Sequence, residues 1–243
     1  MLRNLAAVAM VLCCAGGVPA QDAPDRVTVV AFGDSTTAPR GALTIYAGIL
    51  EKELRAKGVN AAVLNAGVGG NTTDMARRRL KTDVLDHKPA VAIIQFGIND
   101  SAVDVWRNPP ATGPRVTLDA YRANLEYFVD TLSAAGAKIV LMTPNPMRWT
   151  GLLRERYGKP PYRSDDVDGF NVLLKTYAEA VRQVAREKKT ALVDVYAAYE
   201  AFGARDGQSV DALLLDGMHP NEKGHRIVAD LLIARIPSML GKP

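Results

Sequence analysis

The amino-acid sequence predicts an α/β protein with a parallel β-sheet. Short apolar runs of strand length recur along the chain, and segments with apolar residues at helical spacing separate them. Strands that alternate with helices in one domain form a parallel sheet covered by helices on both faces. We therefore expect a five-stranded parallel sheet between two helical layers. Its strands are expected at residues 27–32, 61–64, 91–96, 138–142 and 191–195.

The expected helices follow the strands with little interruption. The clearest one has a single apolar face from Leu118 to Leu132 and is followed by Gly136, a typical helix stop. Two proline-containing segments, 103–117 and 144–166, interrupt the alternation, and loops of such length are commonly functional or mobile. The helices are expected at residues 44–57, 73–83, 118–135, 167–188 and 222–236.

The first twenty residues resemble an export signal. Arg3 supplies a positive charge, an apolar stretch follows it, and Val18-Pro19-Ala20 has the small residues of a cleavage site. The segment is short for a membrane-spanning helix, which needs about 20 apolar residues. We expect a signal peptide at 1–20, a single domain at 21–243, a periplasmic or secreted location, and no stable membrane insertion after cleavage. An uncleaved anchor is the alternative.

Cysteine content and charge exclude several classes of function. Cys13 and Cys14 both lie in the signal segment, and Cys13 follows no convincing lipoprotein-type box. A mature chain without cysteine has no disulfide, thiolate metal site or cysteine nucleophile. The formal net charge of +4 is accompanied by neither a basic run nor an aromatic RNA-binding motif, so we expect no nucleic-acid partner. The sequence carries no signal for an oligomeric state.

Ser35 is the candidate nucleophile. The first predicted strand ends in Phe32 and leads directly into Gly33-Asp34-Ser35-Thr36. Ligands of open α/β sheets bind at the carboxyl ends of the strands, where a hydroxyl can reach a substrate while the strand behind it stays rigid. The alternative is an ordinary turn or a helix N-cap, which these residue types also suit. Serine needs a base to become a nucleophile.

His219 is the candidate base among three histidines. It lies in a loop before the last helix, and Asp216 stands three residues upstream. This spacing lets the Asp216 carboxylate reach Nδ1–H of the ring while Nε2 points toward a serine. Asp216 could instead form an Asx-turn that stabilises the loop. We interpret His87 as a surface or packing residue, and His225, in the last helix, as solvated or core.

An acyl-transfer site also needs donors for the developing oxyanion, and two strand ends can supply them. Gly70 offers a backbone N–H without a side chain, and Asn99 offers an amide N–H. Both follow predicted strands on the same edge as Ser35. A nucleotide-binding interpretation of the glycine run is disfavoured, because it lacks a P-loop lysine and has Thr72 where a dinucleotide motif needs its last glycine.

The four strand-end blocks together resemble the SGNH, or GDSL-type, hydrolases, in that family's order and spacing from Val27 to the last helix. The resemblance implies a flavodoxin-like three-layer α/β/α sandwich with a parallel five-stranded sheet. It also implies a nucleophile, a base with its orienting carboxylate, three oxyanion donors, and no metal or cofactor. Thr36 stands where many members have leucine, a change also found in carbohydrate esterases of the superfamily. The implied residues are Ser35, His219 and Asp216 for the triad, and the N–H groups of Ser35 and Gly70 with the Asn99 side chain for the oxyanion hole.

These observations predict a serine esterase that removes short acyl groups, and acetyl from a carbohydrate is favoured over a lipid ester. The segment 148–163 mixes arginine and lysine with Trp149, Tyr157 and Tyr162, a composition that can stack on sugar rings and attract anionic groups, or can simply be a solvated surface. The alternatives are a lysophospholipase or acyl-thioesterase and, from a different class, a carbohydrate-binding protein on an inactive scaffold.

Overall fold

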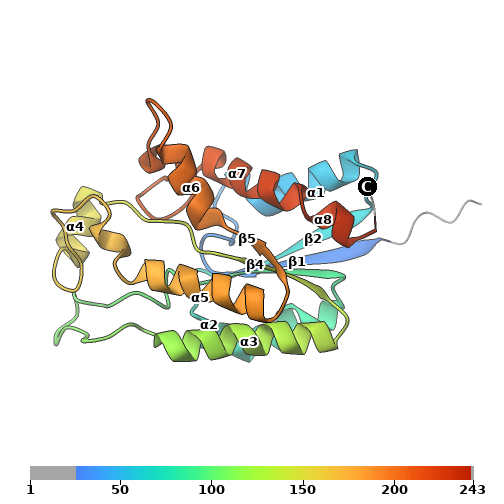
Figure 1. The fold of residues 1–243 in the computed structure, drawn as a ribbon, viewed down its shortest axis with the longest axis horizontal. Coiled ribbons are helices and arrows are strands. Elements are labelled where there is room, and N and C mark those ends of the chain that lie inside the picture. The colour runs from blue at the N-terminus through green and yellow to red at the C-terminus, as the bar shows by residue number, and fades with distance from the viewer. Residues whose placement is uncertain (1–25, 242–243) are drawn as a thin grey trace, which may run out of the picture.

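A computed structural model describes residues 26–241, and within this range one sheet of five parallel strands forms the centre of the molecule (Figure 1). The strands lie in the order β2-β1-β3-β4-β5. The predicted α/β class and five-stranded parallel sheet are therefore confirmed. The strands are β1 (Val27–Gly33), β2 (Ala61–Gly67), β3 (Val91–Gln95), β4 (Lys138–Met142) and β5 (Ala191–Val193).

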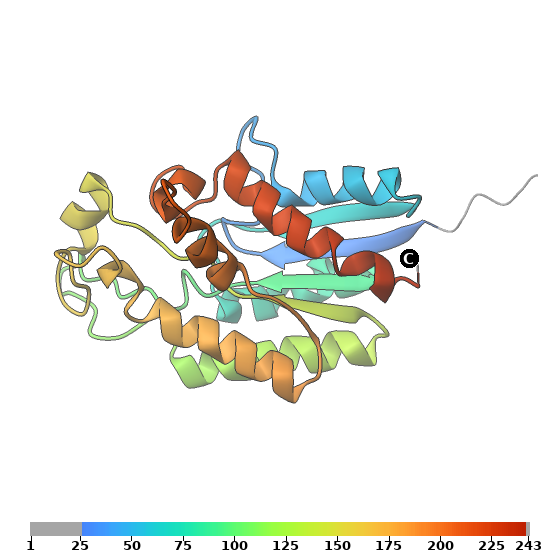
Figure 2. The same cartoon turned by 45° about the horizontal axis from the view of Figure 1, so that its top comes forward.

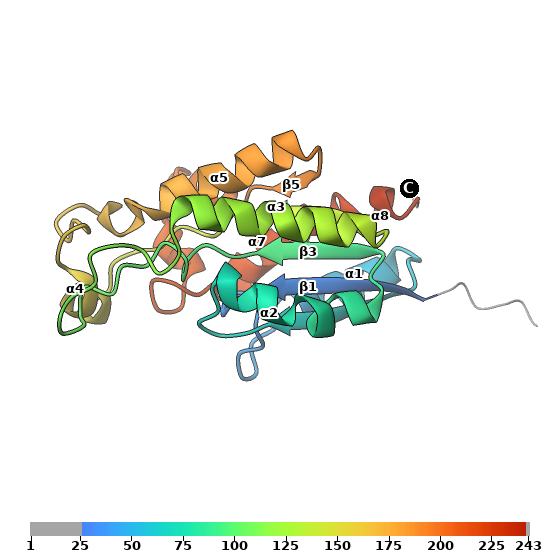
Figure 3. The ribbon, with the colours of Figure 1, turned by 90° about the horizontal axis from the view of Figure 1, so that it is seen from below.

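Helices cover both faces of the sheet, so the described part of the chain has three layers. One layer contains α1, α7 and α8 (Figure 2) and the opposite layer contains α2, α3 and α5 (Figure 3). The helices are α1 (Tyr46–Ala56), α2 (Thr73–Asp83), α3 (Leu118–Ala134), α4 (Gly151–Tyr157), α5 (Leu174–Glu187), α6 (Val195–Gly203), α7 (Glu222–Ile233) and α8 (Ile236–Met239).

The central strand β1 shows why the sheet is buried on both sides. Val29 and Ala31 pack toward α1 and α7, whereas Val30 and Phe32 pack into the core on the other face. All four side chains are fully buried. Side chains of successive strand residues point to opposite faces, so a continuous apolar run is what a strand between two helical layers requires.

The register of the sheet brings three strand ends to one level. Gly33 of β1 pairs with Gly67 of β2 and with Gln95 of β3. The loops that follow these strands therefore begin side by side at the carboxyl edge. The segments after β3 and β4, including α4, extend beyond this same edge (Figures 1 and 3). This is the edge at which open parallel sheets bind ligands.

Several element boundaries differ from the sequence-based expectation. The first helix begins at Tyr46 instead of residue 44, and the last one is divided into α7 and α8. Strand β5 ends at Val193, because Asp194 accepts a hydrogen bond from the N–H of Ala197 and starts α6, which we did not predict. The segment 144–166, expected to be irregular, contains α4, and the helix expected from residue 167 begins at Leu174.

Within residues 26–241, no helix has both the length and the apolar character needed to cross a bilayer. The proposed signal peptide at 1–20 lies outside the described residues.

Candidate active site

Ser35 lies in the turn that follows β1. The turn is fixed by the buried Asp34, whose carboxylate accepts hydrogen bonds from the backbone N–H and the hydroxyl of Thr36, both at 2.9 Å. Burial raises the pKa of Asp34, although the bonds from Thr36 act to lower it. Gly33 is required before the turn, because a Cβ there would lie 2.9 Å from the carbonyl oxygen of Gln95.

Three predicted residues form a continuous hydrogen-bonded series. Nε2 of His219 lies 3.0 Å from Oγ of Ser35, and Nδ1 lies 2.7 Å from Oδ2 of Asp216. The other oxygen of Asp216 accepts the N–H groups of His219 at 2.9 Å and Met218 at 3.1 Å. Asp216 therefore forms the turn and also orients the imidazole. Although partial burial acts to raise it, these bonds from His219 hold the pKa of Asp216 well below its usual value.

The candidate oxyanion donors border the same cavity as Ser35 and His219. This cavity has a volume of about 390 Å³ and is lined by Gly70 and Asn99, with Leu152, Leu153 and Met218 on its other walls. Gly70 has a φ of +76°, a conformation that favours glycine. Nδ2 of Asn99 donates to the carbonyl of Asn71 at 3.1 Å, and it makes a longer hydrogen bond, at 3.5 Å, to Oδ2 of Asp34.

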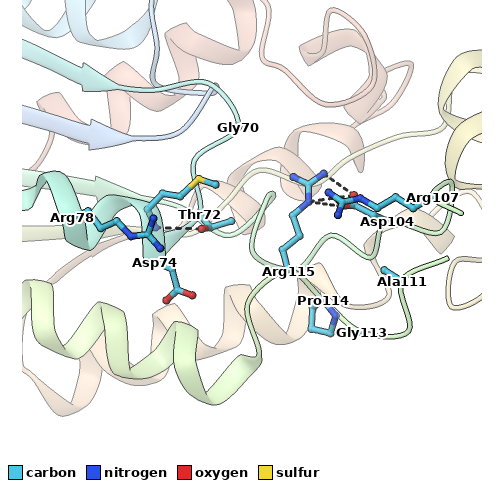
Figure 4. A pocket seen from close by; sticks show the side chains of 11 residues that line it. Gly70, Thr72, Asp74, Arg78, Asp104, Arg107, Ala111, Gly113, Pro114 and Arg115 are labelled. Atoms are coloured by element: carbon cyan, nitrogen blue, oxygen red, sulfur yellow. Dashed lines mark hydrogen bonds and ion pairs between the residues drawn. The ribbon is translucent and has the colours of Figure 1, made fainter. Parts of the chain in front are cut away.

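Arg115 fixes the orientation of the Asn99 amide, a role that our sequence reasoning missed. Its Nη1 donates to Oδ1 of Asn99 at 3.2 Å, so the donor end of the amide is turned away from this cation. Arg115 is held in turn by Asp104, a carboxylate with 3% exposed side-chain surface, at 2.7 Å (Figure 4). Hydrogen bonding to Asp104 raises the pKa of Arg115. The sequence offered no signal for this contact beyond the position of Arg115 in the segment 103–117.

Arg79 of α2 joins two of the strand ends, and this contact too was not predicted. Its guanidinium donates to the carbonyl oxygens of Gly33 at 2.8 Å and Ala66 at 2.7 Å, and to the side chain of Asn71 at 2.8 Å. A cation with five donors can satisfy several carbonyl groups at once. Arg79 therefore stabilises the loops that carry Ser35 and Gly70.

In the described part of the chain, neither of the other histidines is hydrogen-bonded to a member of this series. His87 lies in a short 3₁₀ turn (Leu85–His87) with its side chain exposed. His225 is buried, with 3% exposure, beside the ring of Tyr46. Burial lowers the pKa of His225 to about 4, so it is neutral in the folded protein at neutral pH. Within residues 26–241, no group of three His, Cys, Asp or Glu side chains is placed to hold a metal ion.

The expected sugar-stacking surface at 148–163 is wrong for its three aromatic rings. Trp149, Tyr157 and Tyr162 are 9%, 8% and 5% exposed and pack around Phe170 in a separate apolar cluster beyond the sheet. Trp149 stacks on Phe170 with ring centroids 4.5 Å apart. Arg148 is likewise buried and paired with Glu200. These aromatic residues are the core of a wall beside the cavity, and burying them against each other outweighs exposing them to solvent.

A parallel α/β sandwich whose strand ends bring serine, histidine and aspartate into one hydrogen-bonded series defines an SGNH-type hydrolase fold. Residues 31–227 match the GDSL-like lipase/acylhydrolase family. The chain belongs to this family, and it is a carboxylic ester hydrolase.

Three relatives illustrate the range of the similarity. An uncharacterized lipoprotein of Bacillus subtilis, YqeF, is 35% identical, over 82% of this chain and 85% of its own. An acetylxylan esterase of Geobacillus stearothermophilus is 28% identical over 81% of this chain and 80% of its own. The crystal structure of a lipase/acylhydrolase from Enterococcus faecalis is 26% identical with a TM-score of 0.67, and the match covers 87% of this chain and 96% of that one.

Proposed function

We propose that Ser35 is the nucleophile of this esterase, with His219 as its base and Asp216 as the group that orients the base. Ser35 Oγ attacks the ester carbonyl carbon while its proton passes to Nε2 of His219. The bond to the alcohol oxygen then breaks, and the same proton goes to the leaving alcohol. Water attacks the acyl-enzyme by the same route and releases the acid. The 3.0 Å and 2.7 Å contacts of the imidazole support this assignment.

The negative charge of the tetrahedral intermediate needs preorganised donors, each worth about 3–4 kcal/mol. We assign the backbone N–H groups of Ser35 and Gly70 and the Nδ2 group of Asn99 to this task. Ser35, Gly70 and Asn99 line one cavity, and Arg115 already orients the amide. A donor that is fixed before the reaction costs no reorganisation when the charge forms.

The observation that supports a short acyl group is a small pocket beside the catalytic cavity. It has a volume of about 60 Å³ and adjoins the larger cavity at Ile98, Asn99 and Tyr157. Because one water-sized sphere needs roughly 10–15 Å³, the pocket has room for only a few non-hydrogen atoms. An acetyl group fits, whereas a long acyl chain does not. The two cavities also share Arg115 and Met218, and the remaining lining of the small pocket comes from Ala102, Met147, Tyr162 and Phe170.

We propose a carbohydrate as the alcohol component. The acetylxylan esterase among the relatives supports this choice. A second support is Trp106, which is 42% exposed and lies under the guanidinium of Arg156, a residue that lines the catalytic cavity. A partly exposed aromatic ring beside the cavity suits stacking on a sugar ring. Trp106 lies in the segment 103–117, so it takes the role that we first expected of Trp149.

A lipid hydrolase is the second candidate. Leu152 is 72% exposed and lines the catalytic cavity, so an acyl chain could lie across it at the surface. In that arrangement the chain would bypass the small pocket. The lysophospholipase and acyl-thioesterase alternatives thus predict that longer acyl groups raise kcat/KM, whereas the acetylesterase predicts the reverse.

We also propose that the protein is exported to the periplasm or beyond. The charged, apolar and small-residue parts of segment 1–20 support export, as does the relative named as a lipoprotein. Fractionation of cells and N-terminal sequencing of the mature protein would check this. Recovery of the intact chain, beginning at Met1, from the cytoplasm would contradict it.

The test of the proposed function combines two measurements on the purified domain. We expect kcat/KM for p-nitrophenyl esters to fall once the acyl chain exceeds about four carbons, because the small pocket holds only a few atoms. We also expect acetate release from acetylated xylan or another acetylated glycan. A preference for acyl groups of eight or more carbons, without acetate release from any acetylated glycan, would favour the lipid hydrolase.

A further inference from the structure

A second cavity adjoins the catalytic one. It has a volume of about 520 Å³ and shares Gly70 and Arg115 with the cavity that contains Ser35. Figure 4 shows it between α2 and the segment that carries Asp104 and Arg115. A substrate bound at Ser35 can therefore extend past Gly70 into this second cavity. The proposed triad chemistry makes no use of this space.

Three arginines line the second cavity, from two different elements. Arg78 comes from α2, while Arg107 and Arg115 come from the segment between β3 and α3 (Figure 4). In the part of the chain that the structure describes, no ion pair or hydrogen bond engages the exposed guanidinium of Arg78. A guanidinium that lines a cavity without a partner is available to a ligand.

The two carboxylates in the lining do not cancel this charge. Asp104 is shared by both Arg107 at 2.8 Å and Arg115 at 2.7 Å, so these three residues together keep one positive charge. Asp74 accepts a hydrogen bond from Asn124 of α3 at 2.7 Å, and its carboxylate points toward α3 in Figure 4. The cavity therefore offers a net positive wall to an incoming group.

The remaining lining suits a sugar that carries a carboxylate. Guanidinium groups match carboxylates in planar, paired hydrogen bonds. Thr72 adds a hydroxyl whose oxygen already accepts the N–H of Met75, so its O–H remains a donor. Met75, Ala111 and Pro114 supply apolar surface for the face of a ring.

We propose that this cavity is a subsite for an acidic sugar, a uronate unit next to the unit whose ester reaches Ser35. The substrate class is then an acylated acidic oligosaccharide. The proposal rests on the proposed function for the identity of the alcohol, but the carboxylate subsite can be tested without any acetylated glycan.

The test measures how oligosaccharides inhibit hydrolysis of p-nitrophenyl acetate by the wild-type domain. We expect trigalacturonate to compete with a lower inhibition constant than xylotriose, a neutral trimer. Added salt should raise the trigalacturonate constant and leave the xylotriose constant nearly unchanged, because salt screens exposed charges over about 10 Å at 0.1 M. Equal inhibition by the two trimers would overturn the proposal.

Substitution of Arg78 tests whether the stronger inhibition by trigalacturonate arises in this cavity. We expect Arg78→Gln to raise the inhibition constant of trigalacturonate about five- to tenfold, a reasonable loss for a partly solvated charge-assisted contact. The matched control is Lys81→Gln, which removes the same charge from an exposed position of α2 that does not line the cavity. Loss of trigalacturonate binding of equal size in both variants would show that net charge alone is responsible and would contradict a subsite.

The outcomes separate this proposal from the proposed function. Selective inhibition by trigalacturonate that depends on Arg78 supports the subsite, whether or not acetylated glycans are substrates. Acetate release from neutral acetylated xylan with no response to trigalacturonate would keep the carbohydrate esterase and reject the acidic subsite.

Discussion

Two groups of loops meet at the carboxyl edge of the sheet, and they are held by different forces. The short loops after β1, β2 and β3 form the floor of the site, and polar contacts from Asp34, Arg79 and Arg115 fix them. The segment 144–166 forms a wall, and packing of its aromatic rings around Phe170 holds it. Hydrogen bonds specify direction, whereas apolar packing specifies mainly volume. The floor is therefore suited to chemistry and the wall to shape.

Replacing the proposed nucleophile, in the floor, should have the largest effect on catalysis and almost none on stability. Ser35→Ala should lower kcat by at least about 10⁴-fold, because loss of a triad member ordinarily costs several orders of magnitude. Thermal unfolding should be nearly unchanged, since the Asp34 turn is formed without the Ser35 hydroxyl. The measurement is turnover of p-nitrophenyl acetate together with labelling by a fluorophosphonate. A folded variant that keeps a tenth of wild-type kcat would remove Ser35 from its proposed role.

A substitution in the wall should instead act mainly on stability. Phe170 is 3% exposed and contacts three other aromatic rings, so Phe170→Ala should lower the free energy of unfolding by about 3–5 kcal/mol. Urea unfolding measures this loss. Below the unfolding transition, the variant should accept longer acyl esters than the wild type, because the small pocket loses one of its walls. Unchanged stability would mean that the aromatic cluster does not hold the wall.

In the floor, Asn99→Ala should lower kcat by about 10²–10³-fold with a smaller change in KM. The donor acts mainly on charge that develops in the transition state. Steady-state kinetics with a short-chain ester separates the two parameters. If KM carried the whole effect, Asn99 would bind the substrate in its ground state instead.

Two buried ionisable groups, His225 of α7 and Asp100 in the turn after β3, should give opposite pH dependences of stability. Burial lowers the pKa of His225 to about 4, so the unfolded chain binds its proton first and stability falls as the pH drops below about 6.5. Burial raises the pKa of Asp100 to about 7, so the unfolded chain loses its proton first and stability falls as the pH rises from about 4 to 7.

Each effect should amount to roughly 2–4 kcal/mol, and in the wild type the two largely cancel between about pH 4 and 6.5. Replacing one group should reveal the pH dependence of stability that the other group causes. Urea unfolding of Asp100→Asn should show stability that increases with pH over this range, and His225→Gln should show a decrease. Other titrating groups are common to both variants, so slopes of the same sign and size would contradict the assignment.

The smallest expected effect concerns the orientation of Asn99. Arg115→Met should lower kcat about tenfold, the lower end of the range for a hydrogen bond that involves a charged group, with little change in KM for p-nitrophenyl acetate. Arg115→Lys keeps a cationic donor near Oδ1 of Asn99 and should restore part of kcat. A lysine variant no better than the methionine variant would assign Arg115 a purely structural role.

The floor was largely predictable from the sequence, and the wall was not. Ser35, Gly70 and Asn99 each follow a strand, and strand ends of a parallel sheet share one edge, so their proximity follows from topology. The partners of the amide and of the strand-end carbonyls, Arg115 and Arg79, could not be predicted because sequence gives no distances between loops.

The prediction for the segment 144–166 failed for a different reason. A loop that contains Trp149 and Tyr162 among arginines has the same composition whether its rings face solvent or each other. Only the three-dimensional closeness of Phe170, which comes from beyond the loop, decides between the two. Similarly, α6 begins directly after Asp194 with no turn residue between it and β5, so its apolar start was interpreted as the end of the strand.

The Ser35 hydroxyl and the His219 ring that touches it are separated by 184 positions along the chain. His219 reaches the serine only when the segment before α7 is in place, and α7 packs against α1 near the other end of the chain. A nascent or C-terminally clipped chain thus has the serine without its proposed base. If His219 has this role, we expect hydrolytic activity only from a chain that is folded through α7, and we expect fragments left by incomplete synthesis or proteolysis to be harmless to esters around them.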